Sequence, residues 1–104
     1  MAKYLLLYGG GSMPETEAET AAVTKAWTDW FTELGPAVVD PGNPFNADSK
    51  TISAGPTIVD AKATASGYSV IEADSLDQAA KFAETCPVLL GGAQVMVFET
   101  FEVM

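Results

Sequence analysis

The chain opens with a short apolar run and then changes to a longer periodic pattern. Residues 3–8 read Lys-Tyr-Leu-Leu-Leu-Tyr, which predicts a strand, and three glycines then stop it because they turn freely and extend a strand poorly. Between Thr16 and Gly35, large apolar residues recur every three or four positions, which is the spacing of one helix face. The apolar positions of this predicted helix are Val23, Trp27, Trp30, Phe31 and Leu34.

Both ends of this predicted helix carry boundary signals. Thr16 and Glu19 have the spacing of a capping box, in which the two side chains satisfy free backbone amides. Gly35-Pro36 favours a left-handed cap and then prevents continuation. A second helix is predicted from the capping spacing of Ser75 to Gln78, and Pro87 ends it. Its inner stripe is expected at Leu76, Ala79, Ala80 and Ala83, with Cys86 at the far end.

Short apolar segments bounded by glycine and proline predict the remaining strands. They are residues 37–40, 50–54, 68–73 and 94–103, and residues 57–59 either continue the second of these or pair with it. Pro41-Gly42-Asn43-Pro44 is expected to turn, and residues 60–66 are small and polar and predict a loop. The resulting order is β, α, β, β, β, α, β. It predicts the α+β class, with an antiparallel sheet and two helices on one face.

The first and last predicted strands are apolar on both faces. In the first strand Tyr4, Leu6 and Tyr8 alternate with Leu5 and Leu7, and in the last strand Val95, Val97, Phe101 and Val103 alternate with Met96 and Phe98. Two helices can cover only one face of a four- or five-stranded sheet. The most economical cover for the second face is the sheet of another subunit related by twofold symmetry. The sequence therefore predicts a homodimer.

Length and charge exclude several classes of partner. The 104 residues, of which 48% are hydrophobic, fit one domain that spans 1–104. A net charge of −9 repels phosphates and anionic lipid, so we expect neither a nucleic acid nor a membrane as a partner. The apolar runs are too short to span a bilayer, and the first residues lack the pattern of a signal peptide. We expect a cytoplasmic protein.

The content of cysteine and histidine limits the possible chemistry. Cys86 is the only cysteine, cannot form an intrachain disulfide, and is expected to be a buried apolar residue. The absence of histidine excludes tetrahedral zinc sites and nucleophiles activated by histidine. No carboxylate spacing matches a calcium loop. We expect no metal and no cofactor, and the residues alone assign no catalytic group.

Polar residues near the ends of predicted strands are the candidates for a binding site. They are Tyr8, Asp40, Asn43, Ser53, Tyr68 and Glu72. Together they can line a pocket between the sheet and its loops. Asp40 and Glu72 can act as an acid–base pair where burial separates the pKa values of their carboxyl groups. Carboxylates at strand ends that simply face solvent are the commoner case. Residues 9–11 lack the partners of a phosphate loop and are expected to be a turn.

Five segments of the chain together resemble a known family. They are Lys3-Tyr4-Leu5-Leu6-Leu7-Tyr8, Trp27-Thr28-Asp29-Trp30-Phe31, Pro41-Gly42-Asn43-Pro44, residues 67–77 with Cys86-Pro87, and residues 99–104. Over nearly its full length the chain is similar to the YCII-related, or DGPF-domain, family. The resemblance implies a ferredoxin-like subunit that pairs into a dimeric α+β barrel.

The resemblance also implies a site, from which this chain departs. Family members carry a histidine and an aspartate that are proposed as a catalytic or binding pair. This chain has no histidine, and Asp60-Ala61-Lys62-Ala63 stands in place of the family's aspartate motif, so only Asp60 carries over.

The residues leave three hypotheses about function open. The favoured one is a homodimer that binds a small polar molecule in a cleft near the barrel. The residues expected to line this cleft are Tyr8, Asp40, Asn43, Ser53 and Asp60, with Tyr68. The second is a small enzyme that uses carboxylate and tyrosine acid–base chemistry. The third is an adaptor or regulatory module, for which the sequence offers no repeat and no exposed apolar helix.

Overall fold

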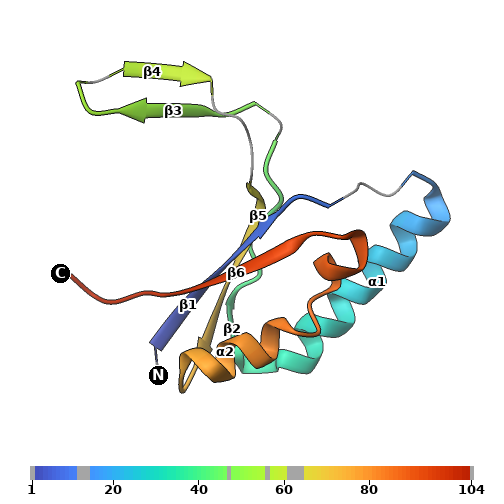
Figure 1. Cartoon of the computed structure of the whole chain (residues 1–104). Helices are drawn as coiled ribbons and strands as arrows, with labels where there is room; N and C mark the ends of the chain where they lie inside the picture. The colour runs from blue at the N-terminus through green and yellow to red at the C-terminus, as the bar shows by residue number, and fades with distance from the viewer. Residues whose placement is uncertain (1, 12–14, 47, 56, 61–64, 104) are drawn as a thin grey trace.

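The structure is a computed structural model that describes residues 2–11, 15–46, 48–55, 57–60 and 65–103 (Figure 1). Its elements are β1 (Ala2–Gly9), α1 (Glu17–Leu34), the 3-10 helix η1 (Gly35–Ala37), β2 (Val38–Asp40), β3 (Lys50–Ser53), β4 (Thr57–Asp60), β5 (Ala65–Ala73), α2 (Leu76–Ala83), the 3-10 helix η2 (Pro87–Gly91) and β6 (Gln94–Glu99). No helix among the described residues is long and apolar enough to cross a membrane.

The strands form two separate sheets. The main sheet has the order β2-β5-β1-β6 with antiparallel neighbours, and β3 and β4 form a hairpin of their own. Both helices lie on the same side of the main sheet (Figure 1). This is a ferredoxin-like arrangement, and it confirms the predicted α+β class.

The helices begin where the sequence predicts, but in both the side chain of the capping-box partner, Glu19 or Gln78, accepts from the amide one residue before the cap. The Glu19 amide donates to Thr16 Oγ1 at 3.1 Å, and the Gln78 amide donates to Ser75 Oγ at 3.1 Å. In a capping box the Glu19 carboxylate would accept from the Thr16 amide, but it accepts from the amide of Glu15 instead. Side chains still satisfy the first turn of each helix, so the caps set both starts.

The helices bury one face of the main sheet, which we call the covered face. Its core contains Tyr4, Leu6, Tyr8, Trp30, Ile71, Ala73, Ala79, Ala83 and Cys86. The indole N–H of Trp30 donates to the Phe82 carbonyl at 3.2 Å and to Thr85 Oγ1 at 3.1 Å. A buried indole needs such a partner, and these bonds tie α1 to the end of α2.

The opposite face of the main sheet, which we call the open face, carries a second apolar surface. Its residues are Leu5, Leu7, Tyr68, Val70, Met96 and Phe98, which pair across the strands as Val70–Leu5–Phe98 and Tyr68–Leu7–Met96. Met96 and Phe98 keep 44% and 46% of their surfaces exposed. The second apolar face expected from the alternation of β1 and β6 is therefore present, and in the single subunit it is only partly covered.

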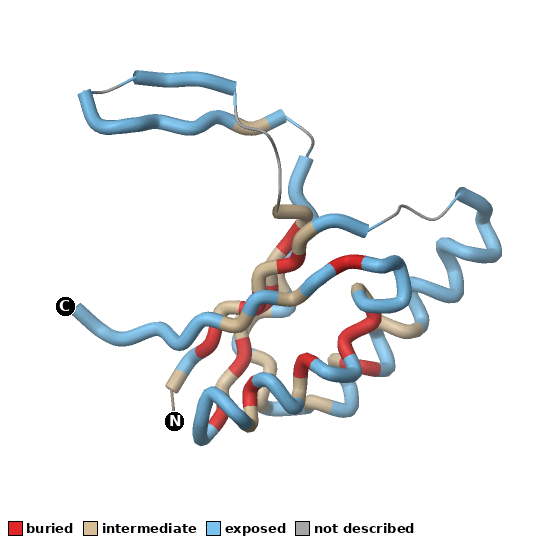
Figure 2. The backbone as a smooth tube through the Cα atoms, in the orientation of Figure 1, coloured by how far each residue is buried: buried red, intermediate tan, exposed pale blue. Residues whose placement is uncertain are grey.

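The β3–β4 hairpin stands away from the main sheet (Figures 1 and 2). Its strands pair from Lys50 with Asp60 to Ser53 with Thr57. Every residue of both strands is exposed. The hairpin thus buries none of its side chains within the subunit.

Two expectations about strands are wrong. Residues 57–60 form a strand that pairs with β3, which is one of the two alternatives left open for this segment, but the predicted order did not count it, so four strands rather than three lie between the helices. The last strand ends at Glu99 and not at Val103: its register with β1 stops at Tyr4, and after the bond from the Thr100 amide to the Lys3 carbonyl β1 is at its own beginning. The predicted loop at 60–66 holds only in part, since Asp60 belongs to β4 and residues 65–66 to β5, while residues 61–64 lie outside the described part.

Some expectations about helix faces are also wrong. Val23 is exposed because the first nine residues of α1 all lie outside the packed part of that helix. Leu76 and Ala80 on α2 are exposed as well, whereas Ala79 and Ala83 are buried. The buried stripe of α2 is therefore narrower than its sequence suggests, because it meets the sheet along only one line of small residues.

Candidate functional site

Asp40 and Tyr68 meet at the end of β2. Asp40 pairs in register with Val70, and Tyr68 lies two residues earlier on the same face of β5. The Tyr68 hydroxyl donates to Asp40 Oδ2 over 3.4 Å, and Asp40 Oδ1 accepts from the Gly42 amide at 2.8 Å. The second bond fixes the carboxylate, whereas the first is long and leaves Oδ2 able to accept from another donor.

Tyr8 lies on the covered face, beneath α1. Its hydroxyl donates to Ser69 Oγ at 2.7 Å, and Ser69 Oγ donates to the Pro41 carbonyl at 2.7 Å. The edge of the Trp27 ring packs against the Tyr8 ring with centroids 5.3 Å apart. Burial raises the pKa of Tyr8, so its hydroxyl keeps its proton at physiological pH. This chain of hydrogen bonds ties the loop after β2 to both central strands.

The loop that follows Asp40 runs close along β5. The Tyr68 amide donates to the Asn43 carbonyl at 3.3 Å, and the Phe45 amide donates to the Ser66 carbonyl at 2.8 Å. Gly42 has a φ of +75°, and a Cβ at this position would overlap the carbonyl oxygen of Tyr68. Only glycine permits both that backbone angle and that approach, so it sets the position of Asp40 and Asn43.

Phe45 places an aromatic ring beside this pair. Its ring stacks on Tyr68 with centroids 5.9 Å apart and an angle of 20° between the planes. Phe45 is exposed and Tyr68 is half-buried, so part of the stack faces solvent. The end of β2 therefore combines a carboxylate, a phenol and an exposed aromatic face.

The other residues that the sequence predicts for the site lie elsewhere. Ser53 and Asp60 belong to the β3–β4 hairpin, where the Asp60 carboxylate accepts from the Lys50 ammonium. Glu72 is half-buried on β5, in register with Lys3. Within the subunit, Asp40, Asn43 and Tyr68 come together at the end of β2. Tyr8 is buried on the covered face, on the other side of the sheet, and Ser53, Asp60 and Glu72 also lie apart from them.

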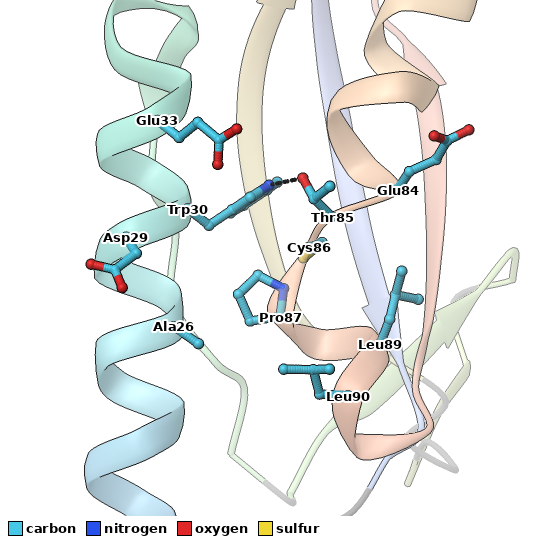
Figure 3. Close-up of a pocket in the computed structure, with 10 residues that line it drawn as sticks. All are labelled: Ala26, Asp29, Trp30, Glu33, Glu84, Thr85, Cys86, Pro87, Leu89 and Leu90. Carbon is cyan, nitrogen blue, oxygen red and sulfur yellow. Dashed lines mark hydrogen bonds between the residues drawn. The ribbon is translucent and has the colours of Figure 1, made fainter.

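A shallow hollow of about 270 Å³ lies between α1 and the end of α2 (Figure 3). Its walls include Trp30, Cys86, Pro87 and Leu90, and the carboxylates of Asp29, Glu33 and Glu84 lie at its sides. The Trp30 indole N–H cannot serve a ligand there, because it already donates to the Phe82 carbonyl and to Thr85 Oγ1. Burial raises the pKa of the Cys86 thiol, which disfavours the reactive thiolate. Neither the indole N–H nor the thiol of this hollow is therefore placed to react with a ligand or to bind one.

Metal-binding groups do not gather in the described part of the chain. No cluster of three or more histidine, cysteine, aspartate or glutamate side chains there is placed to hold an ion.

Two residues of this region were missed by sequence reasoning. Phe45 follows the predicted turn and carried no pattern signal, because its role depends on contact with β5. Ser69 offered a signal: it lies two residues before Ile71 and four before Ala73 on the same strand, so its side chain points to the same buried face. A buried hydroxyl requires a hydrogen-bond partner, and Tyr8 provides it.

Comparison with known proteins bears on the fold. No protein-family model and no curated protein matches the chain. A solved structure does match: 5-chloro-2-hydroxyhydroquinone dehydrochlorinase from Burkholderia phenoliruptrix AC1100, in complex with 2,5-dihydroxybenzoquinone. The TM-score is 0.53 and the identity 23%, over 95% of this chain and 93% of that chain. The chain therefore has the subunit fold of the dimeric α+β barrel class, as the sequence predicts.

Proposed function

We propose that the chain is a subunit of a homodimer that binds a small, planar, hydroxylated ring compound with Asp40, Tyr68 and Phe45. The observation that carries the proposal is that these three side chains meet at the end of β2. Asp40 Oδ2 accepts from a ligand hydroxyl, the Tyr68 hydroxyl donates or accepts, and the Phe45 ring stacks on a planar ligand. The exposed side chain of Asn43 adds an amide on the same loop.

The ligand of the fold neighbour supports this choice of chemistry. The dehydrochlorinase was solved with 2,5-dihydroxybenzoquinone, a planar ring that carries hydroxyl and carbonyl oxygens. Such a ring needs an aromatic face and a few well-placed donors and acceptors, which is what the end of β2 offers.

The extent of exposed surface supports the homodimer. A folded monomer of 10.9 kDa is expected to expose about 5,600 Å². This subunit exposes 7494 Å², an excess of about 1,900 Å² over that expectation. A stable protein–protein interface of standard size removes about 800 Å² from each partner, so the excess is enough for an extensive interface. The open face contributes six neighbouring apolar side chains to that surface, of which Met96 and Phe98 are exposed.

We also infer that the chain is a YCII-related protein that lacks the site expected for its family. The fold agrees with that family, but no histidine is present, and Asp60 is bonded to Lys50 on the exposed hairpin. Binding at Asp40 and Tyr68 does not require either of the family's residues. We place the protein in the cytoplasm, where Cys86 stays reduced.

An enzyme is the second candidate, favoured by the hydrogen bond between Tyr68 and Asp40. In that case the Asp40 carboxylate takes a proton from one ring hydroxyl while the Tyr68 hydroxyl protonates the ring carbon that carries chlorine. Chloride then leaves to solvent as a second ring hydroxyl returns its proton to Tyr68, so the net loss is HCl. Asp40→Asn keeps the shape of the side chain and removes the base. Turnover of a chlorinated hydroquinone by the native chain and not by Asp40→Asn would establish catalysis, and binding without turnover would leave the binding function alone.

Titration calorimetry with 2,5-dihydroxybenzoquinone tests the binding proposal. Because a bond to a charged group is lost, Asp40→Asn should weaken binding about 10- to 100-fold. Asp60→Asn is the matched control, since it removes a carboxylate from the hairpin and should leave affinity unchanged. The proposal fails if the native chain does not bind the compound, or if both variants lose affinity equally.

A further inference from the structure

The β3–β4 hairpin has one face that is built for burial. Because residues directly opposite each other share a face, Ile52 and Ile58 lie side by side, next to the bonded pair of Lys50 and Asp60. The other face carries Thr51, Ser53, Thr57 and Val59. Ile52 and Ile58 keep 62% and 66% of their surfaces exposed. The hairpin is therefore amphipathic, with its apolar face uncovered.

A hairpin of this kind lacks the means to stay folded alone. Two strands without a third strand or a helix behind them are marginally stable in water. These two strands pair only with each other, and all of their residues are exposed. The missing stabilisation has to come from contact with a surface outside the subunit.

The direction in which the hairpin extends indicates where that surface lies. In Figure 1 the hairpin and the segment after β6 both reach out to the left, away from α1 and α2. The subunit is correspondingly extended, with a radius of gyration of 15.2 Å, against about 12.9 Å for a compact domain of this length. A second copy that covers the open face lies within reach of both projections.

We propose that the β3–β4 hairpin is an arm that packs its isoleucine face on the second copy of the chain. This inference rests on the proposed homodimer and adds a second contact to it. We take the partner to be another copy because the subunit exposes two apolar surfaces, the open face and the pair of Ile52 and Ile58. One second copy can bury both. The charges permit it as well, since Lys50 and Asp60 neutralise each other and the arm does not repel a chain of net charge −9.

Photochemical cross-linking tests the arm directly. The photoreactive amino acid p-benzoylphenylalanine replaces Ile58 in one variant and Val59 in the other. Val59 is the matched control because it is the next residue and points to the opposite face. Irradiation of the Ile58 variant should give a covalent species of twice the chain mass, with a yield about fivefold or more above that of the Val59 variant, since side chains alternate between faces along a strand.

Each outcome separates the arm from the homodimer. The mass of the native chain in solution is measured first by sedimentation equilibrium. A native dimer with no covalent dimer from position 58, or with equal yields from both positions, overturns the arm and leaves the homodimer standing. A native monomer overturns both.

A second pair of variants measures how much the contact contributes. Ile52→Ser with Ile58→Ser should raise the dimer dissociation constant about tenfold or more, because two apolar side chains lose their burial. Thr51→Ser with Thr57→Ser changes the opposite face and should leave the constant unchanged. Unchanged dissociation in the isoleucine variant contradicts the arm.

Discussion

The covered and open faces of the main sheet carry similar side chains in different surroundings. Leu6 on the covered face is fully buried beneath the helices, whereas Phe98 on the open face keeps nearly half of its surface exposed. Both residues follow from the same alternation along β1 and β6. Both faces thus carry apolar side chains, but the two helices cover only one of them. A strand that is apolar on both faces can therefore indicate how subunits associate as well as how one subunit folds.

Acidic residues sharpen this contrast. Eight of the fourteen acids lie on the helices or within two residues of their ends: Glu15, Glu17, Glu19, Asp29, Glu33, Asp74, Asp77 and Glu84. The helix side of the subunit therefore repels another copy, while the open face carries its six apolar residues beside one pair of opposite charges, Lys3 and Glu72, which are in register. This distribution favours association through the open face.

The largest effect is expected at the centre of the covered face. Leu6→Ala should lower the free energy of unfolding by about 3–5 kcal/mol, because the lost side chain leaves a cavity beneath the helices. Val23→Ala on α1 is the control and should change it by less than about 0.5 kcal/mol, because Val23 is exposed. Urea denaturation measures both. Similar losses in the two variants would contradict the assignment of the core.

A charge on the open face should break the homodimer. Phe98→Asp is expected to halve the mass measured by light scattering, since it places a carboxylate in the proposed interface. Leu76→Asp is the matched control: Leu76 is exposed to 49%, close to the 46% of Phe98, but it starts α2 on the helix side. That variant should keep the mass of the native chain. If neither variant changes the mass, the open face is not the interface.

The loop between the two faces depends on one close approach. Gly42→Ala should destabilise the fold by about 2–4 kcal/mol, because a positive φ and an overlap with Tyr68 both oppose a side chain. Gly10→Ala has the same φ of +75° and no atom within 4 Å of its added Cβ, so it should lose only about 1–2 kcal/mol. Thermal unfolding of the two variants separates backbone strain from contact, and equal losses would show that the approach to β5 has no effect.

The hydroxyl groups of the tyrosines on the two faces should have the smallest effects on stability. Tyr8→Phe removes a buried hydrogen bond and should lower the free energy of unfolding by about 1 kcal/mol. Tyr68→Phe loses a long, half-buried bond and should lower it by less than about 0.5 kcal/mol.

The sign of the pH effect follows from the raised pKa of Tyr8. The folded state keeps a proton that the unfolded state releases near the ordinary pKa of 10.0, so the stability of the native chain should fall as the pH rises above that value. Tyr8→Phe should fall less steeply. Some slope remains, because the pKa of Tyr4 is raised as well, first by burial and then by its bond to Glu99. Denaturation series from pH 8 to above 10 test this, and identical slopes would contradict it.

Local signals predicted most of the fold. The caps at Thr16 and Ser75 set the start of both helices and Gly35 sets the end of α1, because capping and termination depend on a few neighbouring residues. The end predicted at Pro87 is wrong: α2 ends at Ala83, and Cys86 is the N-cap residue of η2, which begins at Pro87. The end of β6 escaped prediction because a strand lasts only as long as its partner, and the start of β1 decides that. The exposure of Val23 depends on how far the sheet extends beneath α1. The spacing of apolar residues along a helix does not carry that information.

The candidate site was only half predictable. Asp40, Asn43 and Tyr68 were expected near strand ends, and they do meet. Ser53 and Asp60 were expected beside them, but β3 pairs with β4 instead of entering the main sheet, and this carries both residues away. The pairing of β3 with β4 was one of the alternatives that the sequence left open, but whether this pair joins the main sheet depends on contacts between distant segments, which no local pattern encodes.

Sedimentation equilibrium of the unmodified chain over a range of micromolar concentrations tests the central claim most directly. If the open face is an interface between two copies, the measured mass is twice 10.9 kDa. A mass of 10.9 kDa at every concentration would contradict the account, because the open face and the isoleucine pair of the hairpin would then stay exposed to water.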